Sequence, residues 1–197
     1  MKNEVEMTIS GIWQPHLQQQ IFRRLLNAFS YPGRIEECVL RTEPAWLAIL
    51  GALVDGEVTL ADPQQLLSAE IWPKLEARRA APETASFILL DGSAAPTVFP
   101  NLGTLDVPEG GATLLLQVEA LHSDEAGQLR LHLDGPGIKQ QISIGVDGLH
   151  PAWMEARKDW VSGFPMGVEM VLCDAQRFVA LPRTTHIRSR IETGATA

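Results

Sequence analysis

The sequence is poor in the residues from which disulfide frameworks and metal sites are built. Its 197 residues include only two cysteines, Cys38 and Cys173, which lie far apart and have no CxxC neighbour. We expect them to be core thiols of a reducing compartment rather than a disulfide or a zinc pair. The five histidines are scattered, with no HExxH pattern and no Cys/His cluster at ligand spacing. No metal site is therefore predicted.

Lysine is also scarce, which argues against a self-contained pyridoxal-phosphate enzyme. A Schiff-base lysine has to be positioned and desolvated. Of the four lysines, Lys2 is close to the N-terminus, Lys139 follows a turn, and Lys74 and Lys158 fall in amphipathic helical segments. The glycine patterns that cradle phosphate or dinucleotides are absent, as is a GxSxG nucleophile elbow. We predict no cofactor.

Long apolar runs and an excess of positive charge are missing as well. No run approaches 18 uninterrupted apolar residues, and the first six residues are too acidic and polar for a signal peptide. The net charge is −8, from 16 basic and 24 acidic residues. Its field disfavours nonspecific binding to nucleic acid and to anionic membranes. We expect a cytoplasmic protein with neither as a partner.

The length favours one domain over residues 1–197, with residues 1–15 as a flexible N-terminal arm and 188–197 as a flexible tail. Apolar spacing predicts a helix over 16–30, whose apolar residues share one core-facing arc and which ends before Pro32. A nearly all-apolar helix over 45–54 is expected to be buried on several sides or packed against a partner. Further helices are predicted over 64–79 and 151–161. Strands are predicted over 57–61, 84–90, 112–121, 128–133 and 141–144.

The C-terminal third contains a predicted β-hairpin. Two apolar runs, 168–173 and 178–181, flank a polar loop of the length that joins antiparallel strands. The second strand ends at Pro182, which is followed by a polar cluster beginning with Arg183. A rigid strand end can hold such side chains in place. The element order as a whole predicts a three-layer α/β domain with a mixed sheet.

Two groups of arginines are candidates for binding an anion, because the guanidinium fork suits phosphate, phosphonate and carboxylate. One group, around the first helix, is Arg23, Arg24 and Arg34; the other, after the hairpin, is Arg183, Arg188 and Arg190 together with His186. The alternative is that they pair with acids or lie in solvent. That alternative is favoured for Arg188 and Arg190, and both interpretations stay open for Arg24 and Arg183. Glu169 lies inside an apolar strand, so it is either exposed or paired with an arginine, since a lone buried charge is too unfavourable.

Five blocks of the sequence, in order over residues 22–187, resemble the PhnH family of the carbon–phosphorus lyase system. They are Phe22-Arg23-Arg24-Leu25-Leu26-Asn27-Ala28-Phe29-Ser30-Tyr31-Pro32-Gly33, Gly111-Ala112-Thr113-Leu114, Gly135-Pro136-Gly137-Ile138, Phe164-Pro165-Met166-Gly167-Val168-Glu169 and Pro182-Arg183-Thr184-Thr185-His186. The first and the last two are the specific ones. Glu169 departs from the pattern, because the family often has Asp there, and the Pro-rich stretch 93–108 does not align.

The resemblance implies a fold like that of pyridoxal-phosphate-dependent transferases without the cofactor site. It also implies a homodimer in isolation and a cytoplasmic core complex with PhnG, PhnI and PhnJ subunits, required for organic phosphonate catabolism. With PhnL, that machinery forms α-D-ribose 1-methylphosphonate 5-triphosphate from ATP and methylphosphonate. The family's nucleoside-processing activity belongs mainly to PhnI, so the resemblance implies a structural or accessory subunit with no catalytic residues of its own.

On this hypothesis one set of residues forms an interface or an anion-binding cluster: Arg23, Arg24, Pro32, Gly33, Glu169, Arg183, Thr184 and Thr185. A second hypothesis is an independent transferase acting on a phosphorylated metabolite, with Arg24 and Arg183 as the oxyanion clamp and Glu169 as the acid or base. A third is a small-anion-binding domain that catalyses no reaction.

Overall fold

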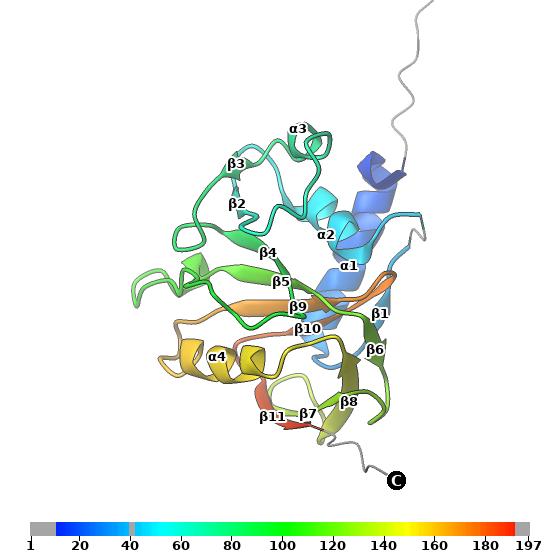
Figure 1. Ribbon diagram of the computed structural model, residues 1–197, viewed down its shortest axis with the longest axis vertical. Coiled ribbons are helices and arrows are strands. Elements are labelled where there is room, and N and C mark those ends of the chain that lie inside the picture. Colours follow the sequence, from blue (N-terminus) through cyan, green and yellow to red (C-terminus); the bar gives the residue numbers. More distant parts are fainter. Residues whose placement is uncertain (1–10, 40–41, 192–197) are drawn as a thin grey trace, which may run out of the picture.

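A mixed seven-stranded sheet forms the middle layer of the protein in the computed structural model, which describes residues 11–39 and 42–191 (Figure 1). Across the sheet the strands are β1 (Glu36–Glu37), β10 (Arg177–Leu181), β9 (Glu169–Cys173), β5 (Thr113–Gln117), β4 (Phe87–Asp91), β2 (Thr59–Ala61) and β3 (Arg78–Arg79). Strands β9, β5, β4, β2 and β3 are parallel to one another. Strand β10 pairs antiparallel with both of its neighbours, β9 and β1. The central strands are buried on both faces, which explains their continuous apolar sequences.

The predicted hairpin is confirmed as β9 and β10. Leu181 pairs with Met170, so the chain leaves β10 beside Glu169, the first residue of β9. In the parallel ladder on the other side of β9, Glu169 pairs with Thr113 at the start of β5. This register brings the polar residues that follow Pro182 to the sheet edge where β5 and β9 begin.

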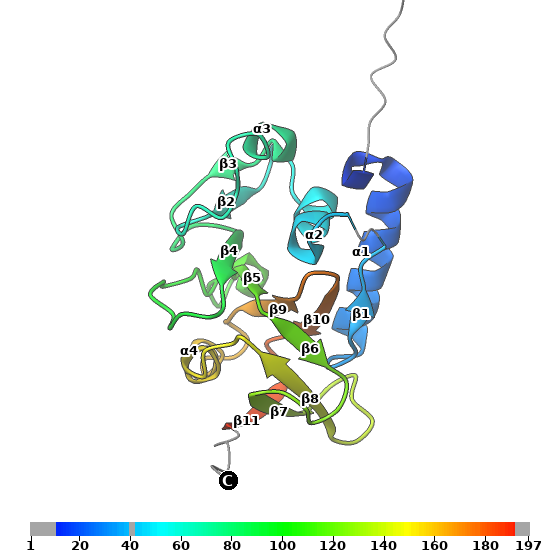
Figure 2. The same cartoon turned by 45° about the vertical axis from the view of Figure 1, so that its right-hand side comes forward.

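Two helices cover one face of the central sheet, α1 (Pro15–Ser30) and α2 (Ala45–Leu53), together with the short helices η1 (Gly11–Trp13) and α3 (Trp72–Leu75). Figure 2 shows α1 and α2 side by side, to the right of the central sheet. Helix α2 packs on α1, η1 and the sheet, and Ala48, Ile49 and Leu50 are completely buried. Its nearly all-apolar sequence is therefore explained by contacts within the chain rather than by a partner.

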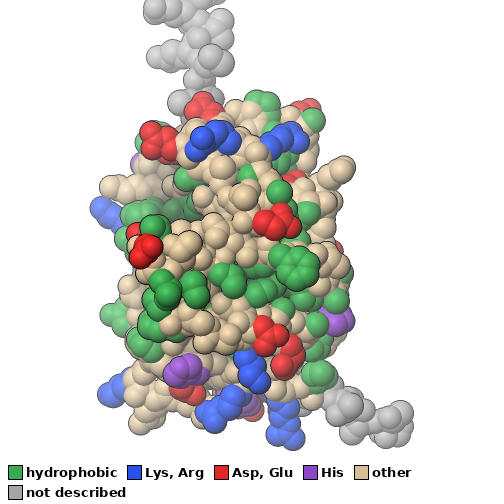
Figure 3. All heavy atoms as spheres, turned by 90° about the vertical axis from the view of Figure 1, so that its left-hand side faces the viewer, with side chains coloured by type: hydrophobic (Ala, Val, Ile, Leu, Met, Phe, Trp, Pro, Cys, Tyr) green, Lys and Arg blue, Asp and Glu red, His purple; other side chains and the backbone are tan. Residues whose placement is uncertain are grey.

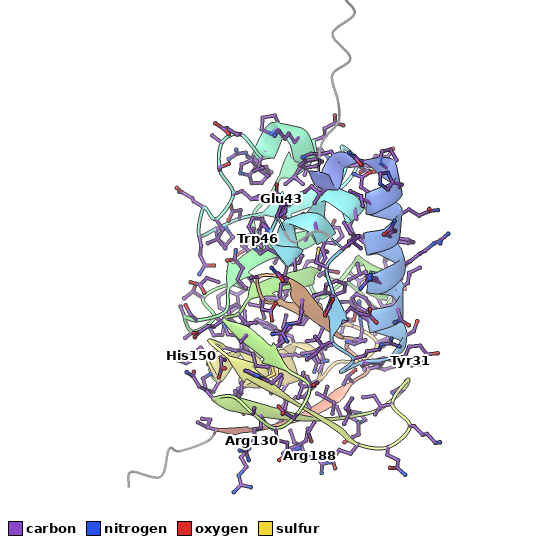
Figure 4. All side chains as sticks on the ribbon, turned by 90° about the vertical axis from the view of Figure 1, so that its right-hand side faces the viewer. Tyr31, Glu43, Trp46, Arg130, His150 and Arg188 are labelled. Carbon is purple, nitrogen blue, oxygen red and sulfur yellow. The ribbon has the colours of Figure 1, made fainter. Side chains whose placement is uncertain are left out.

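The opposite face is covered by α4 (Ala152–Trp160) and by a second, antiparallel sheet. This four-stranded sheet has the order β11 (His186–Ile191), β7 (Leu129–Asp134), β8 (Ile142–Asp147) and β6 (Ala120–His122). In β7, leucines at alternate positions are buried against the central sheet, and the residues between them face outward. Figure 4 shows Arg130 and Arg188 on that outer side. The expected three-layer α/β arrangement with a mixed sheet is present, but its third layer consists largely of this second sheet.

The 3₁₀ helix η2 (Pro108–Gly110) precedes β5 in the long connection between β4 and β5. The strand predicted over 112–121 is divided: β5 ends at Gln117, and β6 begins at Ala120 in the other sheet. The helix predicted over 64–79 is wrong except for the single turn α3. The Asp62 carboxylate accepts hydrogen bonds from the N–H groups of Leu66 and Leu67, which holds a turn there.

The apolar arc predicted for α1 is only partly buried. Ile21, Leu25 and Ala28 belong to the core, whereas Phe22 is 42% exposed and Leu26 is 52% exposed. Helix α2 and the sheet contact only one side of α1, so the other half of the arc faces solvent. Phe22 and Leu26 therefore form an exposed apolar edge of α1, which is a candidate interface.

Both ends of the described chain belong to the fold. Of the expected arm, residues 1–10 lie outside the described residues, but Ile12 is 1% exposed and Pro15 begins α1. Of the expected tail, residues 192–197 lie outside them, but Arg188 pairs with His132 in the ladder of β11 and β7. Within residues 11–39 and 42–191, no helix is both long enough and apolar enough to cross a bilayer.

The turn after α1 is held against the turn between β7 and β8. Gly137 has φ +82°, and a Cβ placed there would overlap the carbonyl oxygen of Ser30 and lie 2.8 Å from Cδ of Pro32. We expect Gly137→Ala to lower the free energy of unfolding by about 1–3 kcal/mol, measured by urea denaturation. The matched control is Gly56→Ala, where the nearest atom would be 3.9 Å away. Equal stability of the two variants would contradict the contact.

The two thiols are expected to be unreactive in the folded protein. Cys38 is 6% exposed and Cys173 is 1% exposed, and burial raises the pKa of Cys173 well above its usual value. A raised pKa leaves less thiolate, which is the form that reacts. Iodoacetamide at pH 8 should therefore label neither thiol until the chain is unfolded by urea, as read by mass spectrometry. Rapid labelling of Cys173 in the native protein would refute the burial.

Candidate functional site

Three connections from distant parts of the chain meet at one end of the two sheets. The β7–β8 turn contacts the turn at residues 30–33 through Gly137, as described above. The same turn contacts the β10–β11 connection through Gly135, where an added Cβ would lie 2.9 Å from the carbonyl oxygen of Thr184. Pro32 and Gly33 are buried in this region, and Gly33 packs on Leu133 and Ile142 of the second sheet. Pro32 and Gly33 therefore hold the layers together.

The ion pair of Glu169 and Arg183 is the polar centre of this region. The Arg183 Nε–H donates to Oε1 of Glu169 at 2.5 Å, and the backbone N–H of Arg183 donates to Oε2 at 2.8 Å. The Glu169 side chain is 22% exposed and the Arg183 side chain is 12% exposed. Of the two interpretations left open for Glu169, the arginine pair is therefore the correct one.

Arg183 also binds two loops through its other nitrogens. Its Nη1 donates to the carbonyl oxygens of Pro108, at 2.6 Å, and Pro165, at 3.0 Å. The peptide bond between Phe164 and Pro165 is cis. Nη2 points toward Gly111, where an added Cβ would lie 3.3 Å from it. The guanidinium thus connects β9, the end of β10, η2 and the loop after α4, and most of its donors are already used.

The arginines of α1 do not join this centre. Arg24 donates from Nη1 to the carbonyl oxygen of Glu37 at 2.8 Å, and Arg23 is exposed on the helix surface. Arg34 pairs with Glu36 at 3.0 Å. The oxyanion clamp of Arg24 and Arg183 that the transferase hypothesis requires is therefore not assembled, because each guanidinium is bonded to a different part of the fold.

Arg188 and Arg190 are exposed on β11, and Arg188 pairs with Asp134 at 3.2 Å. Nδ1 of His186 also lies 3.0 Å from Oδ1 of Asp134. For Arg188, the favoured interpretation as a paired surface charge is confirmed. Within the parts of the chain that the structure describes, no group of three or more His, Cys, Asp or Glu side chains could hold a metal ion.

A cavity of about 450 Å³ lies between α4 and the β10–β11 connection. Its apolar wall comprises Met154, Val161, Phe164 and Ile187, and its polar wall is formed by Arg157, Lys158 and residues 183–186. Of the predicted set, Arg183, Thr184 and Thr185 line this cavity. Glu169 does not line the cavity, but it pairs with Arg183, which does. The predicted Arg23 and Arg24 are not among the residues that line the cavity.

Sequence reasoning missed Arg157, the most deeply buried arginine of this site. It is 2% exposed, and its Nη2 donates to the carbonyl oxygens of Pro182, at 2.5 Å, and Leu181, at 3.5 Å. Burial lowers the pKa of Arg157 to about 10, and the charge of Glu169 opposes that shift, so the side chain remains a cation at neutral pH. Helical spacing could have found it, because residue 157 shares the face of the buried Trp153 and Met154.

A family model described as bacterial phosphonate metabolism protein (PhnH) matches residues 11–188 of the chain. The chain belongs to the PhnH family. The five blocks on which the sequence resemblance rests include the turns and strand ends that converge here.

Two curated relatives agree with this assignment to the PhnH family. One, from Stutzerimonas stutzeri, is named as a candidate C-P lyase subunit, HtxG; it is 42% identical over 176 residues, which cover 89% of this chain and 88% of that protein. The other, from Rhizobium meliloti (strain 1021), is named alpha-D-ribose 1-methylphosphonate 5-triphosphate synthase subunit PhnH. It is 32% identical over 187 residues, which cover 86% of this chain and 89% of that protein.

Removing the Arg183 side chain should destabilise the fold. Arg183→Ala removes the guanidinium donor of Glu169 Oε1 and of two carbonyl groups and keeps only the backbone N–H that donates to Oε2, so the free energy of unfolding should fall by about 2–4 kcal/mol in urea denaturation. Arg183→Lys should restore only part of it, because an ammonium cannot reproduce the planar fork. The control is Arg23→Ala on the exposed surface of α1, expected to change stability by less than about 0.5 kcal/mol. A stable Arg183→Ala protein would show that the ion pair does not hold the loops.

Proposed function

We propose that this protein is a subunit of the carbon–phosphorus lyase core complex, required for the catabolism of organic phosphonates, and that its role there is structural or accessory. Membership of the PhnH family and the names of the two relatives support the proposal. The Rhizobium relative is named as a subunit of alpha-D-ribose 1-methylphosphonate 5-triphosphate synthase. We infer, from the family, that the complex forms this product from ATP and methylphosphonate.

The observation that supports the accessory role is that Arg183 and Arg24 form their hydrogen bonds within the protein. Arg183 is bonded to Glu169 and to two backbone carbonyls, and Arg24 is bonded to the backbone of β1. Residues engaged in this way stabilise a surface rather than bind a reacting phosphate. A transferase acting alone needs both arginines free for substrate, so we favour the subunit.

The exposed edge of α1 is the surface that we assign to a partner. Phe22 and Leu26 are one helical turn apart, and both are about half exposed. Tyr31, which is 55% exposed, lies at the end of the same helix (Figure 4). All three belong to one of the sequence blocks that are specific to the family, yet none belongs to the two hydrophobic cores. Exposed apolar residues grouped in this way mark interaction sites.

We further infer, from the family, that the isolated chain is a cytoplasmic homodimer and that its partners in the complex are the PhnG, PhnI and PhnJ subunits. The family also implies a fold related to pyridoxal-phosphate-dependent transferases, with no cofactor bound. The mixed α/β architecture is compatible with that relationship.

Native mass spectrometry tests the assembly. The chain purified alone should appear as a dimer, and on co-expression with PhnG, PhnI and PhnJ it should enter a complex of fixed stoichiometry. If it stays outside a complex whose other subunits are verified as folded and assembled, the subunit function is refuted.

A double variant tests the α1 edge. Phe22→Ser with Leu26→Ser should abolish incorporation into the complex while leaving the circular dichroism spectrum unchanged, because neither side chain is buried in the core. The matched control is Gln19→Ser with Gln20→Ser, which alters exposed positions of the same helix and should assemble normally. Normal assembly of the apolar double variant would move the interface to another surface.

A further inference from the structure

The connection between β4 and β5 spans residues 92–112 and has no regular structure except η2. Ordered connections of this length are uncommon in compact domains and usually serve a function. Side chains from elsewhere in the fold hold this one in place. The Nε1–H of Trp153 donates to the carbonyl oxygen of Ala94 at 2.8 Å, and Nη1 of Arg183 donates to that of Pro108 at 2.6 Å. The connection is therefore anchored near both of its ends.

This anchored connection turns its largest apolar side chains toward solvent. Phe99 is 76% exposed, Leu105 is 71% exposed and Val107 is 49% exposed. Phe164, in the loop after α4, is 64% exposed. It is brought to the same region because Nη1 of Arg183 bonds both loops. Together, these four apolar residues form an exposed apolar patch.

Figure 3 faces the side of the molecule on which Figure 1 shows α4 and the β4–β5 connection, and hydrophobic side chains form a band across it. Helix α1, with its own apolar edge, lies on the other side of the molecule in Figure 1. Apolar surface grouped in this way marks an interaction site, because its contact with water is unfavourable. An anchored connection also loses little conformational freedom on binding. The apolar patch is therefore suited to contact a partner.

The charge around the apolar patch is mainly negative. Residues 92–110 contain no Lys or Arg, and their two acids, Asp106 and Glu109, are both exposed. On the neighbouring α4, the exposed Asp159 lines a cavity together with residues 96–99 and offsets the charge of Lys158. An apolar centre with an acidic margin is complementary to a surface with an apolar centre and a basic margin.

A second copy of this chain is a poor match for the apolar patch. A two-fold contact centred on the patch brings the acidic margins of both copies together, and like charges across an interface are unfavourable. Each chain also carries a net charge of −8, which adds to the repulsion. The homodimer inferred above is therefore expected to use another surface.

We propose that the apolar patch binds another subunit of the carbon–phosphorus lyase core complex, at an apolar pocket whose margin carries Lys or Arg. Phe99 and Leu105 enter the pocket, and Asp106 and Glu109 face its basic margin. Arg183 is a positioning residue for this contact, because it holds both loops that form the patch. The proposal rests on the subunit function proposed above and adds a second contact surface to the α1 edge.

Site-specific photo-crosslinking in the assembled complex tests the proposal. Leu105→p-benzoylphenylalanine is introduced into the full chain, which is co-expressed with PhnG, PhnI and PhnJ, and the crosslinked subunit is identified by mass spectrometry after irradiation. A crosslink to one of these three subunits is expected. The same replacement at the exposed Glu70, outside the patch, is the control and should give no such crosslink.

The crosslinking result separates this contact from the subunit function. If native mass spectrometry shows an intact complex but position 105 gives no crosslink, or crosslinks to a second copy of this chain, the proposed contact is refuted and the subunit function stands. If the chain does not enter the complex at all, both are refuted.

A double variant tests the apolar part of the contact. Phe99→Ser with Leu105→Ser is co-expressed with the wild-type chain at equal levels, and the ratio of the two in the complex is read by native mass spectrometry. The variant should be incorporated about tenfold less, because the contact loses its apolar anchors. Its circular dichroism spectrum should be unchanged, since both side chains are mostly exposed. Equal incorporation would overturn the proposal.

A charge reversal tests the basic margin of the partner. In the same competition, Asp106→Lys with Glu109→Lys should be incorporated about tenfold less than the wild-type chain. Glu70→Lys with Glu83→Lys makes the same change in net charge at exposed positions outside the patch, and it should compete equally. Equal incorporation of the Asp106 and Glu109 variant would refute the basic margin.

Discussion

The ion pair between Glu169 and Arg183 is the interaction on which this end of the molecule depends. It joins the first residue of β9 to the segment after β10, and the same guanidinium extends to the loops that contain Pro108 and Pro165. A partly buried carboxylate is tolerated at the start of a core strand because this arginine neutralises it. The connection from β10 to β11 is thereby held in place, and with it the wall of the neighbouring cavity.

The second sheet explains why glycine-containing turns recur in the blocks that resemble the family. A sheet layered on another sheet has to be connected at its ends, and here the connections meet at close range. Gly137 lets the β7–β8 turn approach the end of α1, and Gly135 lets it approach Thr184. These motifs therefore serve the architecture.

A subunit of a larger complex needs both a stable frame and a surface left for its partners. In this protein Arg24 and Arg183 form hydrogen bonds within the fold. Phe22 and Leu26 of α1 remain at the surface. The cavity adds a separate feature: Arg157 is a buried cation whose burial is supported on one side by two backbone carbonyls.

The sequence by itself determined the elements whose local pattern is strong: α1, α2, α4, the buried strands and the β9–β10 hairpin. Hydrophobic periodicity and turn residues act over a few positions, so they are visible in one chain segment. It also identified the family and most residues of the ion-pair region. Segment 64–79 was predicted wrongly as a helix, since a turn held by Asp62 replaces the local preference.

Only the tertiary structure decided which contacts those residues make. It showed that Glu169 pairs with Arg183, that Arg24 binds the backbone of β1, and that Arg157 is buried beside a cavity. The division of strand 112–121 between two sheets likewise became apparent only in three dimensions. The physical reason is that an arginine's partner is chosen by distance and burial among residues far apart in the chain, which no local pattern encodes.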